Sequence, residues 1–436
     1  METNPTRMCE LLVGLPAVNV LGVEDDEVCA RLVVHVESRR DQARCPGCGA
    51  RGQRKDRSAV ELVDLPAFGR PARLVWHKQR WSCPVASCAV GSWTVTDDDI
   101  APPRQRLTDR AARWATRQVG KAGRPVAEIA HELDCDWHTV MGAVSAYGEA
   151  LLAQDSARTT GVEALGLDET LFVRRGERHR KHWATSVVDV GGKGHKAKLV
   201  EILEGRIAKA ASSWIDAQPE PWRAQVRWGT LDMSGPYRKA FNDSLGDATQ
   251  VADPFHVVKH ANSKIDECRR RVQTDTLGHR GRRDDPLYRC RRLLTKAHER
   301  LDEEGVAKLT GLLEAGDPKG EVRMCWHAKE TVRSLYDITD PTLAATYLDE
   351  LVADMADDDM PEEVRSLSGT LSRWRDQILA WHTAFVTNGP TESMNNLIKR
   401  IKRIGFGFRK FAHYRIRVLL YAGKPNWDLL ATVTPR

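Results

Sequence analysis

The sequence lacks any long apolar run. Its longer apolar stretches, such as Val418–Ala422, fall far short of the roughly 18 residues that a membrane-spanning helix needs. A secretory signal is also missing, because Leu11–Val23 is only weakly apolar, has no basic lead-in and runs into acidic residues. Internal repeats and low-complexity segments are absent. We therefore expect a cytoplasmic protein with no membrane partner.

The chain also carries little net charge. Its 436 residues include 66 lysines and arginines against 60 acidic residues, which leaves a charge of +6. An excess this small favours an anionic partner without identifying one. Hydrophobic residues make up 41% and charged residues 29%, a balance typical of globular proteins, and the length predicts roughly two to four domains.

Ten cysteines are present, and reducing compartments discourage disulfides, so closely spaced cysteines indicate metal ligands. Cys45 and Cys48 form one pair, and Cys83 and Cys88 form another; the other six show no such pairing. Four thiolates suit tetrahedral Zn²⁺ and leave no open position for chemistry. The pattern predicts a structural zinc site, with the strands between the pairs forming a ribbon.

Apolar residues recur at helical spacing from Leu107 to about Leu152. Val126–Leu133 and Trp137–Tyr147 flank a short turn in which Asp136 can cap the second helix. This is the form of a helix-turn-helix, whose second helix enters the major groove of DNA. A plain antiparallel helix pair is the alternative. The candidate DNA-binding residues here are Lys121, Arg124 and His138.

After Gly161 the pattern returns to strands. Two of them, Lys181–Val190 and His195–Leu203, flank a glycine-rich turn at residues 191–194 and predict a hairpin. Helices and strands then alternate, which predicts a mixed α/β sheet covered by helices, and residues 254–385 are almost entirely helical and highly charged.

Three carboxylates stand at the ends of predicted elements: Asp168 in a strand, Asp232 at the end of another and Glu392 at a helix start. Each alone has a structural explanation, as a turn former or a helix cap. If a crossover sets the two strands side by side, however, the aspartates meet and a later helix adds the glutamate. Converging carboxylates repel one another unless cations such as Mg²⁺ or Mn²⁺ neutralise them, and two such ions promote phosphodiester displacement.

No acidic residue lies between Glu392 and Asp428. The segment is rich in cations interleaved with aromatic residues, which suits a DNA backbone held beside the carboxylates; a solvated helical face is the alternative. The candidate DNA-binding residues in it are Lys399, Arg400, Lys402, Arg403, Arg409 and Lys410.

On these motifs the chain resembles the ISL-three family of bacterial insertion-sequence transposases over nearly its whole length. The cysteine pairs resemble the family's zinc finger, and Val126–Tyr147 resembles its helix-turn-helix. The resemblance to the family's DDE catalytic blocks lies in residues 167–169, 231–233, 252–256 and 388–396. The most specific match is residues 398–409. One departure is Pro254, where the family pattern has arginine.

The resemblance implies an RNase H-like core that a helical insertion interrupts between the second aspartate and the glutamate. The second metal ligand is then Asp232 or Asp253, and we favour Asp232 because its strand follows the first crossover. Asp253 and His256 become neighbours of the site.

The predicted fold class is multidomain α+β, with an N-terminal zinc-binding β module, a helix-turn-helix and an RNase H-like α/β catalytic core with an α-helical insertion. The predicted boundaries are 1–100 for the β module, 105–155 for the helix-turn-helix, 160–262 for the first part of the core, 263–385 for the insertion and 386–425 for the C-terminal helices with the basic tail.

We expect a DNA transposase of an insertion sequence that binds terminal inverted repeats and catalyses metal-dependent strand cleavage and strand transfer. Its partners would be double-stranded DNA and, because two ends must be brought together, a second copy of the chain. Bound to DNA it would associate with the nucleoid. A zinc and helix-turn-helix transcription regulator with an inactive RNase H-like domain would bind DNA without cutting it. A structure-selective RNase H-like nuclease would cut without joining.

Overall fold

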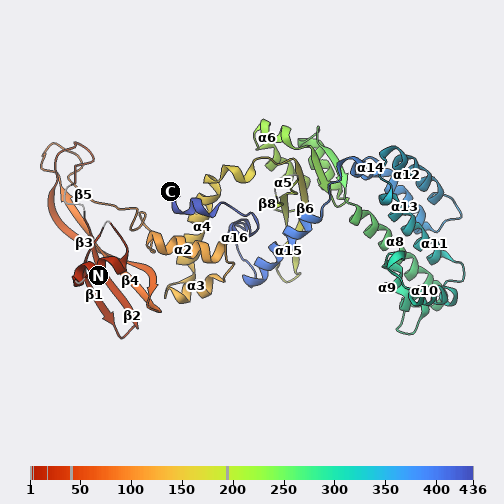
Figure 1. Ribbon diagram of the computed structural model, residues 1–436, viewed down its shortest axis with the longest axis horizontal. Coiled ribbons are helices and arrows are strands. Elements are labelled where there is room, and N and C mark those ends of the chain that lie inside the picture. The colour runs from red at the N-terminus through yellow and green to blue at the C-terminus, as the bar shows by residue number, and fades with distance from the viewer. Residues whose placement is uncertain (1, 3, 17, 40–42, 193–195, 436) are drawn as a thin grey trace. The chain divides into compact units, whose positions relative to one another are not determined.

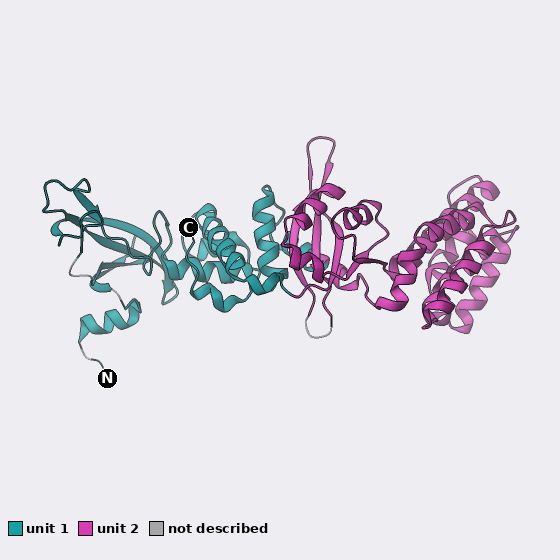
Figure 2. Ribbon diagram, turned by 90° about the horizontal axis from the view of Figure 1, so that it is seen from above, with its two compact units in different colours: residues 1–160, 396–436 teal, residues 161–395 magenta. Residues whose placement is uncertain are grey.

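The computed structural model describes residues 2, 4–16, 18–39, 43–192 and 196–435. The chain divides into two compact units (Figure 2). Unit 1 comprises Met1–Thr160 and Asn396–Arg436, and unit 2 comprises Gly161–Asn395.

Unit 1 begins with helix α1 (Pro5–Val13) and a five-stranded sheet of order β1-β2-β4-β3, with β5 paired to β4. The strands are β1 (Val18–Asp26), β2 (Arg31–Ser38), β3 (Gln53–Ala67), β4 (Arg70–Ser82) and β5 (Ser92–Thr94). Alternate residues of these strands face a small apolar core around Val36, Leu74 and Trp76. β3 and β4 form a long antiparallel hairpin, which confirms the ribbon predicted between the cysteine pairs.

The helices of unit 1 follow the sheet: α2 (Asp109–Gly120), α3 (Val126–Glu132), α4 (Trp137–Gln154), the short η1 (Ser156–Thr159) and, from the C-terminal segment, α16 (Phe411–Ala422) and η4 (Trp427–Ala431). Ile129, Leu133, Val140 and Val144 are buried between the helices, as the apolar spacing predicted. The carboxylate of Asp136 accepts the backbone N–H of Thr139 at 2.9 Å and caps α4. The helix-turn-helix geometry is therefore confirmed.

The C-terminal segment contributes to both units. Helix α15 (Gly389–Ile404) begins in unit 2, whereas the residues from Asn396 onward belong to unit 1, where α16 packs on α2 and α4. The sequence division grouped residues 386–425 with the catalytic core as one part. Sequence patterns do not reveal this distribution, because the apolar face of α16 matches any helical partner.

Unit 2 contains a five-stranded sheet of order β10-β9-β6-β7-β8. Figure 1 labels β6 and β8 of this sheet. Its strands are β6 (Ala164–Arg175), β7 (Arg180–Asp189), β8 (Lys198–Glu204), β9 (Trp228–Leu231) and β10 (Thr249–Ala252). The first three form an antiparallel meander, while β9 and β10 run parallel to β6. The predicted hairpin is confirmed by the pairing of β7 with β8; residues 193–195 of its predicted turn lie outside the described residues.

One face of this sheet packs against α5 (Ala208–Asp216) and α7 (Gly235–Ser244), and α6 (Glu220–Gln225) precedes β9. Leu165, Leu167 and Leu231 point into this core. Because side chains alternate along a strand, Gly166, Asp168 and their neighbours face the opposite side, where the first turns of α15 lie.

The chain between β10 and α15 forms a helical insertion, as predicted. Its helices are α8 (Pro254–Leu277), α9 (Pro286–Thr295), α10 (Glu303–Gly316), α11 (Glu321–Ser334), α12 (Pro341–Met355), α13 (Glu362–Arg373) and α14 (Arg375–Ala384), with η2 (His298–Arg300) and η3 (Leu335–Asp337) between them. Their apolar faces form one continuous core that extends to the sheet. None of the described helices has the length and apolarity to cross a bilayer.

Candidate active site and DNA-binding elements

Three aspartates stand at one edge of the second sheet. Asp168 lies in β6, Asp232 directly follows β9 and Asp253 directly follows β10. The parallel registers of β6 with β9 and of β9 with β10 put the three residues at one level. The sequence prediction that Asp168 and Asp232 end up on neighbouring strands is confirmed.

The carboxylate of Asp168 is held by hydrogen bonds on both oxygens. Asn395 of α15 donates its side-chain N–H to Oδ2 at 2.5 Å, and the backbone N–H of Glu169 donates to Oδ1 at 2.6 Å. Ser186 of β7 in turn donates to the side-chain oxygen of Asn395 at 2.9 Å. Burial and the charge of Asp232 nevertheless raise the pKa of Asp168 to about 6. A carboxylate with this pKa gains from a nearby cation.

Asp232 has a different environment. Burial raises the pKa of its carboxyl group above the usual value, although the charge of His256 opposes that shift. Its Oδ1 is buried, and among the described residues it has no hydrogen-bond partner. A buried acceptor without a donor is costly unless an ion or a ligand satisfies it.

Asp253 is 4% exposed, and both of its oxygens are engaged. Oδ1 accepts the backbone N–H of Asn388 at 2.8 Å, and Oδ2 lies 3.0 Å from His256 Nδ1. The second nitrogen of His256 lies 3.5 Å from Glu392 Oε1. Burial opposes the charge on His256, but its hydrogen bond to Asp253 and the charges of Asp253 and Asp232 outweigh burial and raise the pKa of the imidazole. His256 thus connects Glu392 to the aspartate edge.

The start of α15 is fixed by close contacts with the sheet. Thr230 donates its hydroxyl to the side-chain oxygen of Asn388 at 3.0 Å. Gly166 leaves space for Thr391, since a Cβ at Gly166 would lie 2.2 Å from the Thr391 hydroxyl oxygen. The approach therefore requires glycine at this position, and Glu392 is held one residue further along the helix.

Gly166→Ala is expected to lower strand-transfer activity about 100-fold, because the added methyl group pushes Thr391 away and so displaces the start of α15 and Glu392. DNA affinity should be unchanged. Adding Thr391→Ala removes the clashing hydroxyl and should restore part of the activity. Gly311→Ala in α10, where nothing lies within 4 Å of an added Cβ, is the matched control. Full activity of the Gly166 variant would show that the position of α15 does not matter.

The four predicted zinc ligands come together in unit 1. Cys45 and Cys48 precede β3 while Cys83 and Cys88 follow β4, so the hairpin brings both pairs to its open end. The sulfur atoms of Cys45 and Cys88 are 3.6 Å apart, those of Cys48 and Cys83 are 3.5 Å apart, and all four lie within 4.8 Å of one another. Zn–S bonds of 2.3 Å in a tetrahedron separate sulfurs by about 3.8 Å, so the cluster fits zinc.

The turn that carries Cys45 favours the thiolate form of this one ligand. Burial disfavours the thiolate of Cys45, but hydrogen bonds from the backbone N–H groups of Cys48 and Gly47 outweigh it and lower the pKa of this thiol to about 7. Thiolates are the metal-binding form of cysteine.

The predicted DNA-binding residues are mostly exposed. Lys121, His138, Lys399, Arg400, Arg403, Arg409 and Lys410 are exposed, and Lys402 is half-buried. On α15 these cations lie opposite the buried Ile398 and Ile401, which is the pattern of an amphipathic helix. Arg124 instead donates to Glu128 at 2.5 Å and to Glu132 at 2.7 Å, so its charge is already neutralised within the unit.

Several residues of this arrangement were missed by sequence reasoning. Asn395, Ser186 and Thr230 take part in the hydrogen bonds around the aspartate edge. One signal was available: Asn395 lies three residues after Glu392, which puts both on the same side of a helix.

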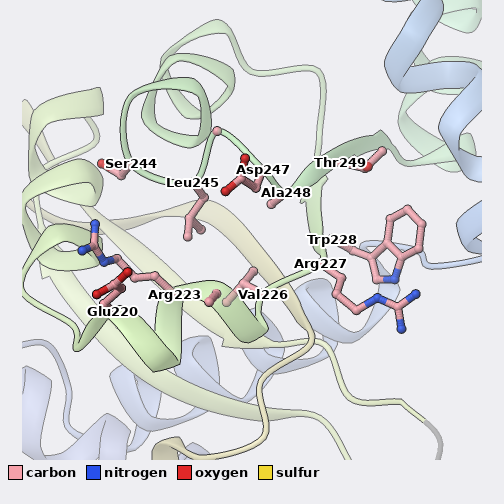
Figure 3. Close-up of a pocket in the computed structure, with 12 residues that line it drawn as sticks. Glu220, Arg223, Val226, Arg227, Trp228, Ser244, Leu245, Asp247, Ala248 and Thr249 are labelled. Carbon is pink, nitrogen blue, oxygen red and sulfur yellow. The ribbon is translucent and has the colours of Figure 1, made fainter.

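A separate cavity of about 560 Å³ lies at the opposite ends of β9 and β10 (Figure 3). Arg227, Trp228 and Thr249 line it where these strands begin, whereas Asp232 and Asp253 lie where they end. It is therefore not part of the carboxylate site.

Comparison with protein families agrees with this organisation. Residues 165–418 match a family described as transposase. Residues 41–88 match the zinc-finger of transposase IS204/IS1001/IS1096/IS1165, and residues 99–148 match the helix-turn-helix domain of transposase family ISL3.

Individual relatives extend the match. The transposase for insertion sequence element IS1001 of Bordetella parapertussis is 25% identical over 94% of this chain and 97% of its own length. The transposase for insertion sequence element IS1557 of Mycobacterium tuberculosis is 28% identical over 63% of each chain. Among solved structures, a weak likeness links the chain to the Drosophila P element transposase strand transfer complex, with a TM-score of 0.37 and 11% identity over 74% of this chain and 94% of that one. With the family matches covering the zinc finger, the helix-turn-helix and most of the remaining chain, the protein belongs to the ISL3 family of insertion-sequence transposases.

Proposed function

We propose that Asp168, Asp232 and Glu392 are the catalytic residues and that they hold Mg²⁺ or Mn²⁺ during DNA cleavage and strand transfer. The observation that carries the proposal is the aspartate edge itself: two carboxyl groups with raised pKa on adjacent parallel strands, one with a buried oxygen that has no partner among the described residues. Such oxygen ligands suit hard divalent cations.

The donor set fits these cations, because carboxylate oxygens are what Mg²⁺ prefers and the converging negative charges disfavour one another without it. When bound, two ions would supply Lewis-acid activation of water or of a 3′-hydroxyl and neutralise charge on the phosphodiester. Asn395 orients Asp168, and His256 orients Glu392. Asp253 has both oxygens engaged, which favours Asp232 as the second ligand.

The remaining parts would bind the DNA. In this proposal the zinc module and the helix-turn-helix recognise terminal inverted repeats, and the cations of α15 contact phosphates. Two ends must be joined, so the active form is a homodimer, and the protein works at the nucleoid in the cytoplasm. We also propose that the chain has the five domains predicted from the sequence, in which residues 386–425 carry Glu392 and the basic tail.

The test compares Asp232→Asn with Asp253→Asn in strand-transfer assays on DNA ends taken from the sequences that flank the gene. We expect activity only with Mg²⁺ or Mn²⁺, no activity for the Asp232 variant and a reduction of about tenfold for the Asp253 variant, which keeps one of its two hydrogen bonds. A dead Asp253 variant beside an active Asp232 variant would reverse the assignment. Binding without cleavage would indicate a regulator, and cleavage without joining would indicate a nuclease.

A further inference from the structure

The loop between α15 and α16 lines a pocket in unit 1. Gly405–Lys410 forms one side, and the first residues of α3 and α4 form the other. The pocket measures about 490 Å³, within the range of roughly 300–1,000 Å³ typical of sites for small ligands. Trp137 and His413 lie in it with ring centroids 5.5 Å apart. The pocket is thus an aromatic slot beside the start of the helix expected to enter the major groove.

Arg417 lines this pocket, and no carboxylate of the described part of the chain pairs with it. The residue is 3% exposed, and its Nη2 donates to the backbone oxygen of Arg124 at 3.2 Å. Its Nε has no hydrogen-bond partner among the described residues, and its guanidinium lies 5.5 Å from the centre of the Phe408 ring. Burial lowers the pKa of Arg417 to about 10. A buried guanidinium whose Nε–H has no acceptor indicates a ligand that presents an acceptor atom.

Phe406 lies at the rim of the pocket and, in contrast to the buried Arg417, is exposed. Its side chain is 95% exposed, and its backbone has a positive φ of 50°. Gly405 before it is required by close packing, since a Cβ there would lie 2.8 Å from the Phe408 ring and 3.2 Å from Arg417. The loop thus covers the buried Arg417 with a half-buried Phe408 while it presents Phe406 to solvent. Among the described residues, no other ring and no cation pairs with this aromatic side chain.

The charge around the pocket identifies the kind of ligand. Arg403, Arg409 and Lys410 are exposed beside it, and no acidic residue occurs between Glu392 and Asp428. An apolar peptide or a second copy of the chain would gain little from this concentration of cations, whereas the phosphates of DNA would. Bases present both a flat face for stacking and acceptor atoms at their edges.

We propose that this pocket takes up one unstacked nucleobase of a bound DNA end, stacked among Trp137, His138 and Phe408 with its acceptor edge towards Arg417, while Phe406 fills the space that the base leaves. The proposal rests on the proposed function, because it concerns DNA that the transposase has already bound. Extruding a base costs least where pairing is weak, and stacking on aromatic side chains compensates for it.

The test uses duplexes of the terminal sequence, each with one 2-aminopurine at a different position, because this base fluoresces more strongly when the base stacked on it is extruded and the weakly quenching ring of Phe406 takes its place. Wild-type protein should enhance fluorescence several-fold at one position. Phe406→Ala should lower the population of the extruded state about 5- to 100-fold, in line with the energy of a base–aromatic stack. The fluorescence enhancement should fall with it. The matched control is Phe68→Ala, since Phe68 is 82% exposed and also has a positive φ, at the β3–β4 turn.

A second measurement uses the wild-type protein alone, so it does not require that a variant folds. Duplexes carrying 5-iododeoxyuridine next to the enhanced position should crosslink to Trp137, His138 or Phe408 in the wild-type protein, as identified by mass spectrometry. Wild-type protein that binds the duplexes without enhancement at any position, or that crosslinks only outside the pocket, would overturn this inference and leave the proposed function intact. Failure to bind any duplex would overturn both.

Discussion

Asp168→Asn is expected to abolish strand cleavage and strand transfer while it makes the metal-free protein more stable. The loss of activity should be at least about 10³-fold, because an amide has no charge with which to hold Mg²⁺ and metal-ion catalysis contributes several kcal/mol. DNA binding should persist, since the residues expected to contact DNA lie elsewhere. Gel-based assays of cleavage and joining, alongside a binding titration of the same preparation, measure both effects.

The gain in stability follows from the environment of this carboxyl group. Burial and the nearby charge of Asp232 raise its pKa from 3.8 to about 6, so ionisation of Asp168 costs the folded state free energy. That cost is absent at low pH and grows as the pH rises through about 6, reaching roughly 1–3 kcal/mol at pH 8. Asparagine removes the charge but loses one of two hydrogen bonds, worth about 1 kcal/mol. The net gain should be about 0–2 kcal/mol at pH 8 and vanish near pH 4.

Thermal unfolding with and without Mg²⁺ measures this gain. Each kcal/mol should raise the melting temperature by roughly 2–4 °C for a unit of this size. Mg²⁺ should stabilise the wild-type protein and leave the variant unchanged. Asp243→Asn is the matched control, because Asp243 forms an exposed pair with Lys239 at 3.0 Å and such pairs contribute little. A variant less stable than the wild type at pH 8 without metal would contradict the electrostatic account of the site.

Much of this arrangement follows from local sequence patterns. Strand alternation and a single crossover are sufficient to place Asp168 beside Asp232, since connections between parallel strands follow few routes. The cysteine pairs converge because the residues between them form one hairpin. The cap of α4 by Asp136 depends only on a short polar side chain before a helix.

Other features depend on contacts between distant segments and leave no local signal. Gly166 reads as an ordinary strand glycine, and its role appears only when Thr391 is placed against it. The N-terminal β1 was not predicted, because its exposed and buried residues alternate poorly. Arg417 belongs to a stretch of cations in the sequence, yet packing buries it. Burial of a charged residue depends on which element covers it, and sequence spacing does not encode that.

Removal of zinc is expected to unfold the open end of the β3–β4 hairpin and to lower the affinity for DNA ends at least about 100-fold. The free energy of zinc binding by four cysteines is on the order of 10 kcal/mol at neutral pH, which exceeds what a small sheet gains from its own core. The sheet also supports the helix-turn-helix, because Arg73 of β4 donates to the backbone oxygen of Leu133 at 3.2 Å and to the carboxylate of Asp134 at 2.9 Å. Loosening the sheet therefore disturbs the turn before α4.

Cys48→Ser tests this dependence without a chelator. Metal analysis should find one zinc per chain in the wild type and none in the variant, and the variant should lose the corresponding thermal transition. Cys29→Ser is the matched control, since Cys29 is an exposed thiol in the turn between β1 and β2 and lies outside the cluster. Because the ligands bind as thiolates, acidification should release zinc from the wild type as protons compete for the sulfurs. A Cys48 variant that retains zinc and full DNA affinity would contradict a structural role for the metal, because only a cluster that holds the hairpin closed couples zinc to the position of the helix-turn-helix.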